Sequence, residues 1–527
     1  MHQSKEKQRT ERRPFHEKSR RGALNFLFGR SALIILLLLI QILLMIGLFM
    51  RWQYSYFAYG STYVLSVFMA LYIINRPMNS NTRQTWLVLI LLAPVVGTLL
   101  YVYVENDIGH RLVRNRLDQI HTQTDRLLPS QEKLAEKLKV SEPALYSLGQ
   151  YTLNHGGFPV YANTTVKYFP SGEDKFVSLL EELERAEKFI FMEYFIIDEG
   201  YMWDSILEIL QRKAAQGVDV RVMYDGTCAI FKLPYHYPEK LRAMGIQCKM
   251  FSPIRPLVST HYNNRDHRKI VVIDGHTAYT GGINLADEYI NRKTVHGHWK
   301  DTAIMLKGEA VRSFTLMFLQ LWNVSERTLE YQEYLAAPLP DLPETPGYVL
   351  PYGDSPFDDE RVGESIYLDI INRAKKYVHI MTPYLIIDGE MTHALTYAAK
   401  RGVDVRLILP HIPDKKSAFS LAYTHYRELL KDGVRIYEYT PGFVHAKVFV
   451  SDDEKAVVGT INLDYRSLYL HFECAAYLYQ TPAIPEIEQD FRSTLKACQQ
   501  VTLDTLKTDR LYRKVLGWLL KVFAPLM

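Results

Sequence analysis

The pattern HxKxxxxD occurs twice in this chain, and its residue types can carry nucleophilic and acid-base chemistry. Its defined positions are His267, Lys269 and Asp274 in the first copy and His445, Lys447 and Asp452 in the second. Imidazole, with an ordinary pKa of about 6.5, can act as nucleophile or proton donor near neutral pH. The nearby ammonium group binds anions. Two such sets predict one composite, donor-rich site for a tetrahedral phosphoryl group, and a phosphodiester is the substrate class that fits it.

Polar residues downstream of each copy extend the predicted site. An asparagine follows a glycine-containing turn in both cases, Asn284 and then Asn462, and each offers an amide donor to substrate. Two acids follow, Asp301 within HWKD and Glu473 within HFE. We expect these carboxylates to accept the Nδ1 proton of a histidine and so fix its tautomer. One histidine would attack phosphorus and the other would be general acid and base, and the sequence leaves open which is which.

Competing uses of the same residue types lead to different expectations. Asp274 and Asp452 are counted in the catalytic motif, but as acids at strand ends they fit the anchoring of a turn better than contact with substrate. Zinc binding is the other common use of histidines and acids. A lysine two residues from each histidine disfavours it, because an ammonium group repels a metal cation. We therefore expect neither a metal nor a cofactor.

The elements that must position these residues are repeated along the chain. Both motif copies alternate and are rich in β-branched residues, which predicts strands with His and Lys on one face. The stretch GVDVR at 217–221 recurs at 402–406. Each half has the order apolar strand, helix, second strand and motif strand, which predicts an α/β fold with sheets covered by helices. The predicted domains are a first repeat over 148–335, a Pro-rich linker over 336–348 and a second repeat over 349–500.

The region before the repeats is predicted to attach the chain to the cell membrane as a multi-pass protein. Residues 1–30 form a tail with nine Lys/Arg against three acids, which indicates a cytoplasmic N-terminus and can also hold anionic lipid. Residues 31–104 are predicted to hold two or three transmembrane helices, with candidates at Ser31–Met50, Phe57–Ile74 and Trp86–Val104. Pro94 and Gly97 are expected to kink or pack the third. Three spans would put the catalytic part outside and two would keep it inside.

The remaining segments and the composition fit a membrane enzyme. The 527 residues are 48% hydrophobic with a formal net charge of +4, and the four cysteines lack the paired spacing of a disulfide framework or zinc ribbon. Residues 105–147 are charged and helix-prone and are expected to be a helical connector. Residues 501–527 predict an amphipathic tail, either a membrane-surface helix or a helix packed on the domain.

Several stretches give the chain a specific resemblance. They are NHGGFPVY, MEYFIIDEG, the first motif through GGINLADEY, HWKD, TPYLIID, YEYTPGFVHAK and GTINLDYRSLYLHFE. On these residues the chain resembles the phospholipase D superfamily and, within it, bacterial cardiolipin synthases. The resemblance implies two phospholipase D-like repeats with mixed β-sheets flanked by helices, preceded by N-terminal transmembrane helices. It departs at Thr460, where the family often has Ser, and in the extra apolar segment at Ser31–Met50.

The activity implied by the resemblance is phosphatidyl transfer between two phosphatidylglycerols, giving cardiolipin and glycerol through a phosphohistidine. The expected partners are phosphatidylglycerol and anionic membrane lipid, and not nucleic acid. The alternative is a hydrolase, a phospholipase D or nuclease, because water can replace the alcohol. A basic groove with interleaved aromatic residues would favour a nuclease, and the mixed charge outside the tail does not provide one. A scaffold with a degenerate site would be expected to lack a motif histidine.

Overall fold

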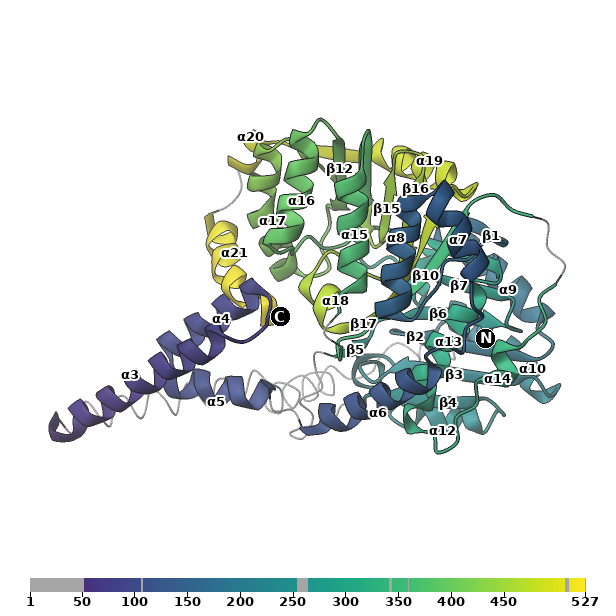
Figure 1. Ribbon diagram of the computed structural model, residues 1–527, viewed down its shortest axis with the longest axis horizontal. Coiled ribbons are helices and arrows are strands. Elements are labelled where there is room, and N and C mark those ends of the chain that lie inside the picture. The colour runs from purple at the N-terminus through teal and green to yellow at the C-terminus, as the bar shows by residue number, and fades with distance from the viewer. Residues whose placement is uncertain are drawn as a thin grey trace, which may run out of the picture. The chain divides into compact units, whose positions relative to one another are not determined.

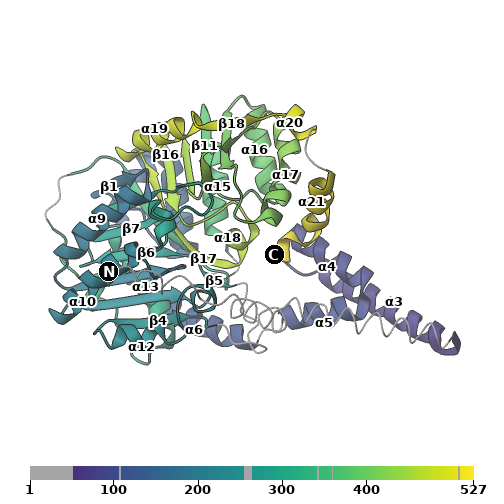
Figure 2. The same ribbon diagram turned by 180° about the vertical axis from the view of Figure 1, so that it is seen from behind.

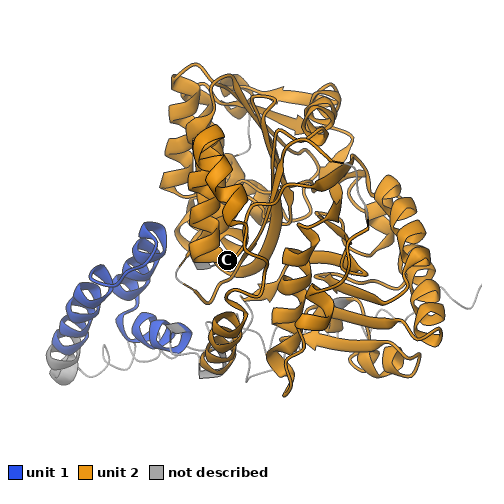
Figure 3. Cartoon of the chain, turned by 45° about the vertical axis from the view of Figure 1, so that its right-hand side comes forward, with its two compact units in different colours: residues 1–109, 254–260 blue, residues 110–253, 261–527 orange. Residues whose placement is uncertain are grey.

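The computed structural model describes residues 52–105, 108–253, 264–340, 344–358, 360–507 and 511–526. The chain divides into two compact units, coloured separately in Figure 3: residues 1–109 with 254–260, and residues 110–253 with 261–527. The predicted basic tail and the predicted span Ser31–Met50 lie outside the described residues.

The described part of the first unit is helical. It contains α3 (Trp52–Ile74), α4 (Ser80–Leu92) and α5 (Pro94–Glu105). The residue before a proline avoids the helical region, and Ala93 has φ −139° and ψ 73°, so the helix stops there and restarts at Pro94. A Cβ at Gly97 would lie 2.8 Å from the carbonyl oxygen of Leu89, so this glycine permits close packing of α4 and α5. The single helix predicted over 86–104 is corrected to two helices.

Among the helices of the described ranges, none is both long enough and apolar enough to cross a membrane. The transmembrane helices predicted over 57–74 and 86–104 are therefore not confirmed.

The second unit begins with a helical segment and then holds two sheets. The segment comprises α6 (Ile108–Thr124) from residue 110 on, α7 (Glu132–Ser141), α8 (Pro143–Tyr151) and the π-helical turn η1 (Thr152–Gly156). The first sheet contains β1 (Thr164–Phe169), β2 (Phe189–Tyr194), β3 (Asp219–Asp225), β4 (Gln247–Phe251), β6 (Lys269–Ile273), β7 (Thr277–Gly281) and β9 (Ala303–Gly308). The second contains β10 (Tyr348–Asp354), β11 (Tyr377–Met381), β12 (Asp404–Pro410), β13 (Arg435–Tyr439), β15 (Val448–Ser451), β16 (Lys455–Gly459), β17 (His471–Tyr479) and β18 (Cys498–Val501).

The two sheets share one topology, which confirms the predicted α/β fold with mixed sheets. The first runs β1-β9-β7-β6-β2-β3-β4, and the second runs β10-β17-β16-β15-β11-β12-β13 with β18 added at the edge. In each, the strands β2-β3-β4 or β11-β12-β13 are parallel, and the other neighbours in these two orders are antiparallel. The chain is thus a duplication in three dimensions as well as in sequence.

Helices cover the sheets in both repeats. They are α9 (Gly172–Arg185), α10 (Tyr201–Ala215), α11 (Cys228–Phe231), α12 (Tyr237–Arg242) and α13 (Val311–Trp322) in the first, with α15 (Val362–Arg373), α16 (Gly389–Lys400), α17 (Lys416–Lys431), α18 (Tyr465–Tyr469) and α19 (Ala483–Leu495) in the second. Figures 1 and 2 show α15, α16 and α17 side by side along the second sheet. Ser171 and Asp388 cap α9 and α16 through side-chain oxygens, which satisfies amides that a helix start leaves free.

The motif strands lie in the interior of this unit. All five residues of β6 and all four of β15 are buried, because helices or the other repeat cover both faces. Helix α13 packs on β6 of the first sheet and on β10 of the second, and Phe314, Met317 and Phe318 of this helix are fully buried. The connection between repeats, with α14 (Gln332–Leu335), places Tyr334 against Phe189 and Phe191 at ring-centroid distances of 5.0 and 4.9 Å. One apolar core therefore joins the repeats and fixes the motif strands.

The C-terminal segment contains α20 (Leu503–Lys507), α21 (Leu511–Phe523) and η4 (Ala524–Leu526). Helix α21 packs on α17 at Gly517, where a Cβ would lie 2.6 Å from the carbonyl oxygen of Ser420. Arg513 lies over the rings of Phe419 and Tyr423. Trp518 and Leu519 on this helix are 70% and 61% exposed. The tail is a helix packed on the domain that also presents apolar side chains to solvent.

Candidate active site

The two motif histidines lie immediately before the buried strands and not within them. His267 falls between the two-residue strand β5 (Arg265–Asp266) and β6, and His445 falls between β14 (Gly442–Val444) and β15. The strand prediction therefore began two residues too early in the first copy and three in the second. Both imidazoles are almost fully buried, with side-chain exposures of 8% and 10%.

Backbone pairing between the repeats places each histidine against the repeat to which it does not belong. Strand β5 pairs in parallel with the start of β17, and β14 pairs in parallel with β8 (His298–Lys300). At the end of each short ladder the histidine amide donates to the other repeat: His267 N to the carbonyl of Phe472 at 2.9 Å and His445 N to that of Lys300 at 2.7 Å. The residue after each acceptor is an acid, so each histidine arrives beside the acid of the other half.

The two histidine-carboxylate pairs are consequently crossed. His267 Nδ1 lies 2.8 and 3.0 Å from the two carboxylate oxygens of Glu473, and His445 Nδ1 lies 2.7 Å from Oδ2 of Asp301. Both acids are fully buried. A carboxylate on Nδ1 holds the imidazole in one orientation and directs Nε2 to the other side of the ring, where a substrate atom can meet it.

Burial sets the protonation of this site. It lowers the pKa of His445 to about 4, with a further lowering from the Lys447 ammonium group. Burial and then Lys269 hold the pKa of His267 well below its usual value. Burial also raises the pKa of the Glu473 carboxyl well above its usual range. Each effect disfavours charge in a dry interior, so the site without substrate favours neutral imidazoles.

Both motif lysines are inside the site. Lys269 Nζ donates to the carbonyl of His267 at 2.6 Å, and Lys447 Nζ donates to the carbonyl of His445. Burial lowers the pKa of Lys269 to about 8 and that of Lys447 to about 7. An arriving anion would favour the ammonium form of both, so the pair is suited to a phosphoryl group.

The residue between His267 and Lys269 anchors the motif from the opposite face. Arg268 Nε donates to Glu193 at 2.6 Å, and its Nη2 donates to the carbonyl of Met317 at 3.2 Å. All three groups are buried in the core beside α13. This contact fixes the backbone at the point from which the imidazole and the ammonium group project.

The motif aspartates lie at turns and bind backbone. Asp274, with φ 52°, accepts hydrogen bonds from the amides of residues 187, 188 and 189 at 2.7–2.9 Å. Asp452, with φ 57°, does the same with residues 375, 376 and 377 at 2.7–2.9 Å. Asp274 thereby fixes the start of the neighbouring strand β2, and Asp452 fixes the start of β11. The geometry favours the turn-anchoring role over contact with substrate.

The two asparagines differ in their surroundings. Asn284 accepts from the amide of Ile196 at 3.1 Å and donates to the hydroxyl of Tyr289 at 2.8 Å, so protein groups occupy both ends of its amide. Asn462 is buried with no hydrogen-bond partner on its Oδ1 among the described residues. The amide oxygen of Asn462 can therefore accept a hydrogen bond from a ligand without displacing a protein group.

The position two residues before each asparagine also differs between repeats. Thr460 donates its hydroxyl to Oε2 of Glu473 and so supports the carboxylate that holds His267. The first repeat has Gly282 at this place, where a Cβ would lie 2.0 Å from Oδ1 of Asp301. The glycine makes room for the shorter acid, which instead accepts from the amide of Thr302 at 2.8 Å.

Sequence reasoning missed the rings that surround the histidines. Tyr289, Trp299 and Phe443 lie around His445 at centroid distances of 5.5, 5.4 and 5.9 Å. Phe195 and His471 lie against His267 at 4.9 and 5.5 Å. Aligning HWKD with HFE would have found two of them, because Trp299 and His471 both stand two residues before the acid.

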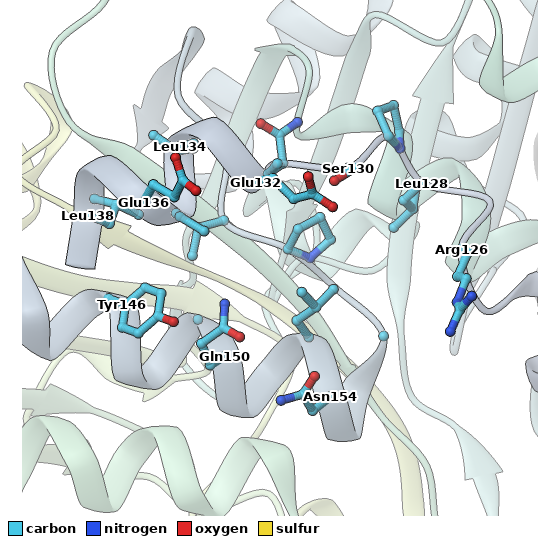
Figure 4. A pocket seen from close by; sticks show the side chains of 18 of the residues that line it. Arg126, Leu128, Ser130, Glu132, Leu134, Glu136, Leu138, Tyr146, Gln150 and Asn154 are labelled. Carbon is cyan, nitrogen blue, oxygen red and sulfur yellow. The ribbon is translucent and has the colours of Figure 1, made fainter.

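The charges in the site disfavour a metal ion. His267, His471 and Glu473 place ligand atoms within 4.8 Å of one another. The same space is bordered by Lys269 and Lys447, whose charges repel a cation and attract an anion. A cavity of 920 Å³ lies elsewhere, beside α7 and α8, and contains none of the motif residues (Figure 4).

Comparisons with known proteins identify relatives of this chain. A family profile described as cardiolipin synthase, PLD-like domain, matches residues 179–322 and 367–495, together more than half of the chain. A protein of Streptococcus mutans described as uncharacterized is 52% identical over 87% of this chain and 99% of its own. The cardiolipin synthases of Alkalihalophilus pseudofirmus and Geobacillus kaustophilus are 32% and 34% identical, each over 88% of this chain and 92% of their own.

The fold is shared with a solved structure of another protein. The crystal structure of phosphatidylserine synthase from Haemophilus influenzae superposes with a TM-score of 0.55 at 17% identity, over 72% of this chain and 97% of that chain. At this identity the likeness concerns the fold alone. The family profile and the extended identity to cardiolipin synthases carry the assignment: the chain belongs to the cardiolipin synthase family of phospholipase D-like proteins.

Proposed function

We propose that this protein is a phosphatidyltransferase that makes cardiolipin and glycerol from two molecules of phosphatidylglycerol. The observation that carries the proposal is the crossed arrangement of two buried histidines, each held at Nδ1 by a carboxylate of the other repeat. Two imidazoles with their Nε2 atoms available and two lysines beside them form a site for a phosphodiester anion. Membership of the cardiolipin synthase family gives the substrate class.

In the first half-reaction, Nε2 of one histidine bonds to phosphorus while the bond from phosphorus to the glycerol oxygen breaks. The other histidine enters this step as an imidazolium, protonated from solvent once the phosphodiester anion is bound, and gives its Nε2 proton to that oxygen, so free glycerol leaves and a phosphohistidine and a neutral imidazole with Nδ1–H remain. In the second half, a headgroup hydroxyl of another phosphatidylglycerol gives its proton to the same imidazole as its oxygen displaces the histidine. The number of phosphodiester bonds is unchanged, so no energy source is needed.

The other polar residues have supporting roles in this cycle. Lys269 and Lys447 neutralise the phosphoryl oxygens, on which negative charge is concentrated during transfer. Asp301 and Glu473 keep each imidazole in the tautomer with Nδ1–H and stabilise the imidazolium form when it arises. Asn462 has an amide oxygen without a protein partner among the described residues, and this oxygen can accept from a substrate hydroxyl. Asp274 and Asp452 act indirectly, by fixing the strand ends that carry the motifs.

The protein works at the bacterial cell membrane in this proposal. Ser31–Met50 is long and apolar enough in sequence to span the bilayer, and the basic tail before it places the N-terminus in the cytoplasm. The apolar side chains exposed on α21 provide a second contact with the lipid surface.

The test is mass spectrometry of lipids after incubation of the purified protein with phosphatidylglycerol alone in detergent micelles. Cardiolipin and free glycerol from the unmodified protein, and neither from His445→Ala, would support the transferase. Phosphatidic acid as the sole lipid product would identify a hydrolase instead. Absence of any product from the unmodified protein would refute the choice of phosphatidylglycerol as donor.

A further inference from the structure

His471 and Trp299 occupy equivalent positions in the two repeats and carry different rings. Each stands two residues before the acid that holds a motif histidine, His471 before Glu473 and Trp299 before Asp301. His471 lies 5.5 Å from the ring of His267, and Trp299 lies 5.4 Å from the ring of His445. The fold therefore puts one ring beside each reactive imidazole, and the chain has an imidazole on one side and an indole on the other.

The ring nitrogens of both residues have no hydrogen-bond partner among the described residues. This holds for Nδ1 and Nε2 of His471 and for Nε1 of Trp299. The nearest acid to His471 is Glu473, at 3.8 Å from Nδ1. The His471 side chain is only 9% exposed, so these nitrogens are withdrawn from water without compensation from the protein. Buried polar atoms in this condition are rare, and at an enzyme site a ligand is the expected partner.

The charge state of His471 limits the ligand that it can accept. Burial holds its pKa well below the usual value, and Arg466, Lys269, Arg265 and Lys415 lower it further. A neutral imidazole has one N–H donor and one acceptor nitrogen. A phosphate dianion or carboxylate could use only the donor and an ammonium group only the acceptor. A hydroxyl group can meet either nitrogen, because it accepts from the N–H or donates to the bare nitrogen.

We propose that His471 binds the non-reacting hydroxyl of the glycerol headgroup of phosphatidylglycerol next to His267, and thereby favours this alcohol over water and simple alcohols, which lack a second hydroxyl, in the second half-reaction. This inference rests on the proposed phosphatidyl transfer. Trp299, with a single donor, cannot accept from a hydroxyl, so the two sides of the site treat the alcohol differently. His471 acts here by binding the alcohol, and the proton transfers remain with His267 and His445.

The experiment compares the fate of the phosphatidyl group in four chains: the unmodified protein, His471→Phe, His471→Asn and the control His425→Phe. Each is incubated with phosphatidylglycerol and ethanol in micelles, and cardiolipin, phosphatidic acid and phosphatidylethanol are quantified by mass spectrometry. Phe keeps a ring of similar shape without nitrogen, and Asn keeps a donor and an acceptor. His425 is also buried, but it lies on α17 and its ring has no contact with the motif histidines among the described residues.

We expect His471→Phe to lower the ratio of cardiolipin to the other two products by about tenfold, the size of effect that loss of a buried hydrogen bond gives. His471→Asn should keep a ratio closer to the unmodified protein, and His425→Phe should keep it unchanged. An unchanged ratio in His471→Phe would overturn the inference. If that chain does not fold, His471→Leu replaces it, and an Asn ratio no higher than the Leu ratio overturns the inference. Failure of the unmodified protein to release glycerol would instead refute the proposed function.

Discussion

Replacement of Glu473 by Gln should disable His267 while leaving the fold intact. Both oxygens of this carboxylate lie at hydrogen-bond distance from His267 Nδ1, at 2.8 and 3.0 Å, and Thr460 donates to one of them. A Gln with its oxygen on Nδ1–H keeps the tautomer but loses the negative charge, which weakens the hydrogen bond by about 1.5 kcal/mol, or roughly tenfold in rate. A Gln in the reverse orientation favours the wrong tautomer, for which losses of about 10⁴-fold are known. The turnover number should therefore fall between these limits.

The Michaelis constant should change little in this variant, because Glu473 contacts the imidazole and not the lipid. The melting temperature at pH 7 should not fall. Burial raises the pKa of this carboxyl above its unfolded value, so its ionised form costs stability at every pH above the unfolded pKa, and a neutral Gln removes that cost. A loss of turnover without a loss of stability is the expected result.

The second repeat offers a matched control. Glu488 holds Nδ1 of His379 at 2.9 and 3.0 Å, and both side chains are buried, but His379 belongs to β11 and to no motif. Glu488→Gln makes the same replacement, of one carboxylate oxygen by an NH2 group, in the same kind of histidine–carboxylate pair. It should keep the turnover of the unmodified protein. Steady-state kinetics on phosphatidylglycerol micelles measures both variants. Full turnover in Glu473→Gln, or equal losses in the two variants, would refute the positioning role.

Three further changes test other parts of the site. The pKa of Lys447 is lowered to about 7 and that of Lys269 to about 8, so kcat/KM should fall as pH rises through this range and the ammonium groups of the free enzyme deprotonate. Lys447→Met should lower kcat/KM at pH 6 and weaken this pH dependence. A flat profile in the unmodified protein would contradict the role of the lysines. Gly282→Ala should displace Asp301 from His445 and reduce turnover by about tenfold or more, whereas Gly389→Ala, with open space at its Cβ, should not; circular dichroism checks that both fold. Deletion of residues 1–106 should reduce cardiolipin formation on vesicles more than in micelles, and equal activity on vesicles would show that this region does not recruit the enzyme to lipid.

The sequence was sufficient to predict the duplication and the α/β class, because strand patterns, GVDVR and the motifs recur in one order. It was also sufficient to name Asp301 and Glu473 as partners of the histidines. It could not assign which acid meets which histidine. That assignment depends on the pairing of β5 with β17 and of β14 with β8, two short ladders between residues about 150 to 200 apart, for which a local pattern has no signal.

Two other features were not predicted from the sequence, for similar reasons. Hydropathy over 86–104 is continuous and predicted one helix with a kink or a packing contact at Pro94 and Gly97, whereas the steric restriction on the residue before Pro94 ends one helix and starts another. His471 was passed over because its importance lies in its distance from His267 and in nitrogens without partners, neither of which a single sequence expresses. In both cases backbone geometry or a three-dimensional distance decided the outcome.

The crossed pairs also predict how two inactive chains should behave together. His267→Ala and His445→Ala each remove one of the two imidazoles, and each alone should lose turnover. In this structure both histidine-carboxylate pairs form within one chain, so every site in an equimolar mixture of the two variants still has one imidazole. The mixture should remain as inactive as its components, whether mixed after purification or produced together. Recovery of cardiolipin synthesis on co-production would mean that the repeats exchange between chains and that a working site draws its histidines from two molecules.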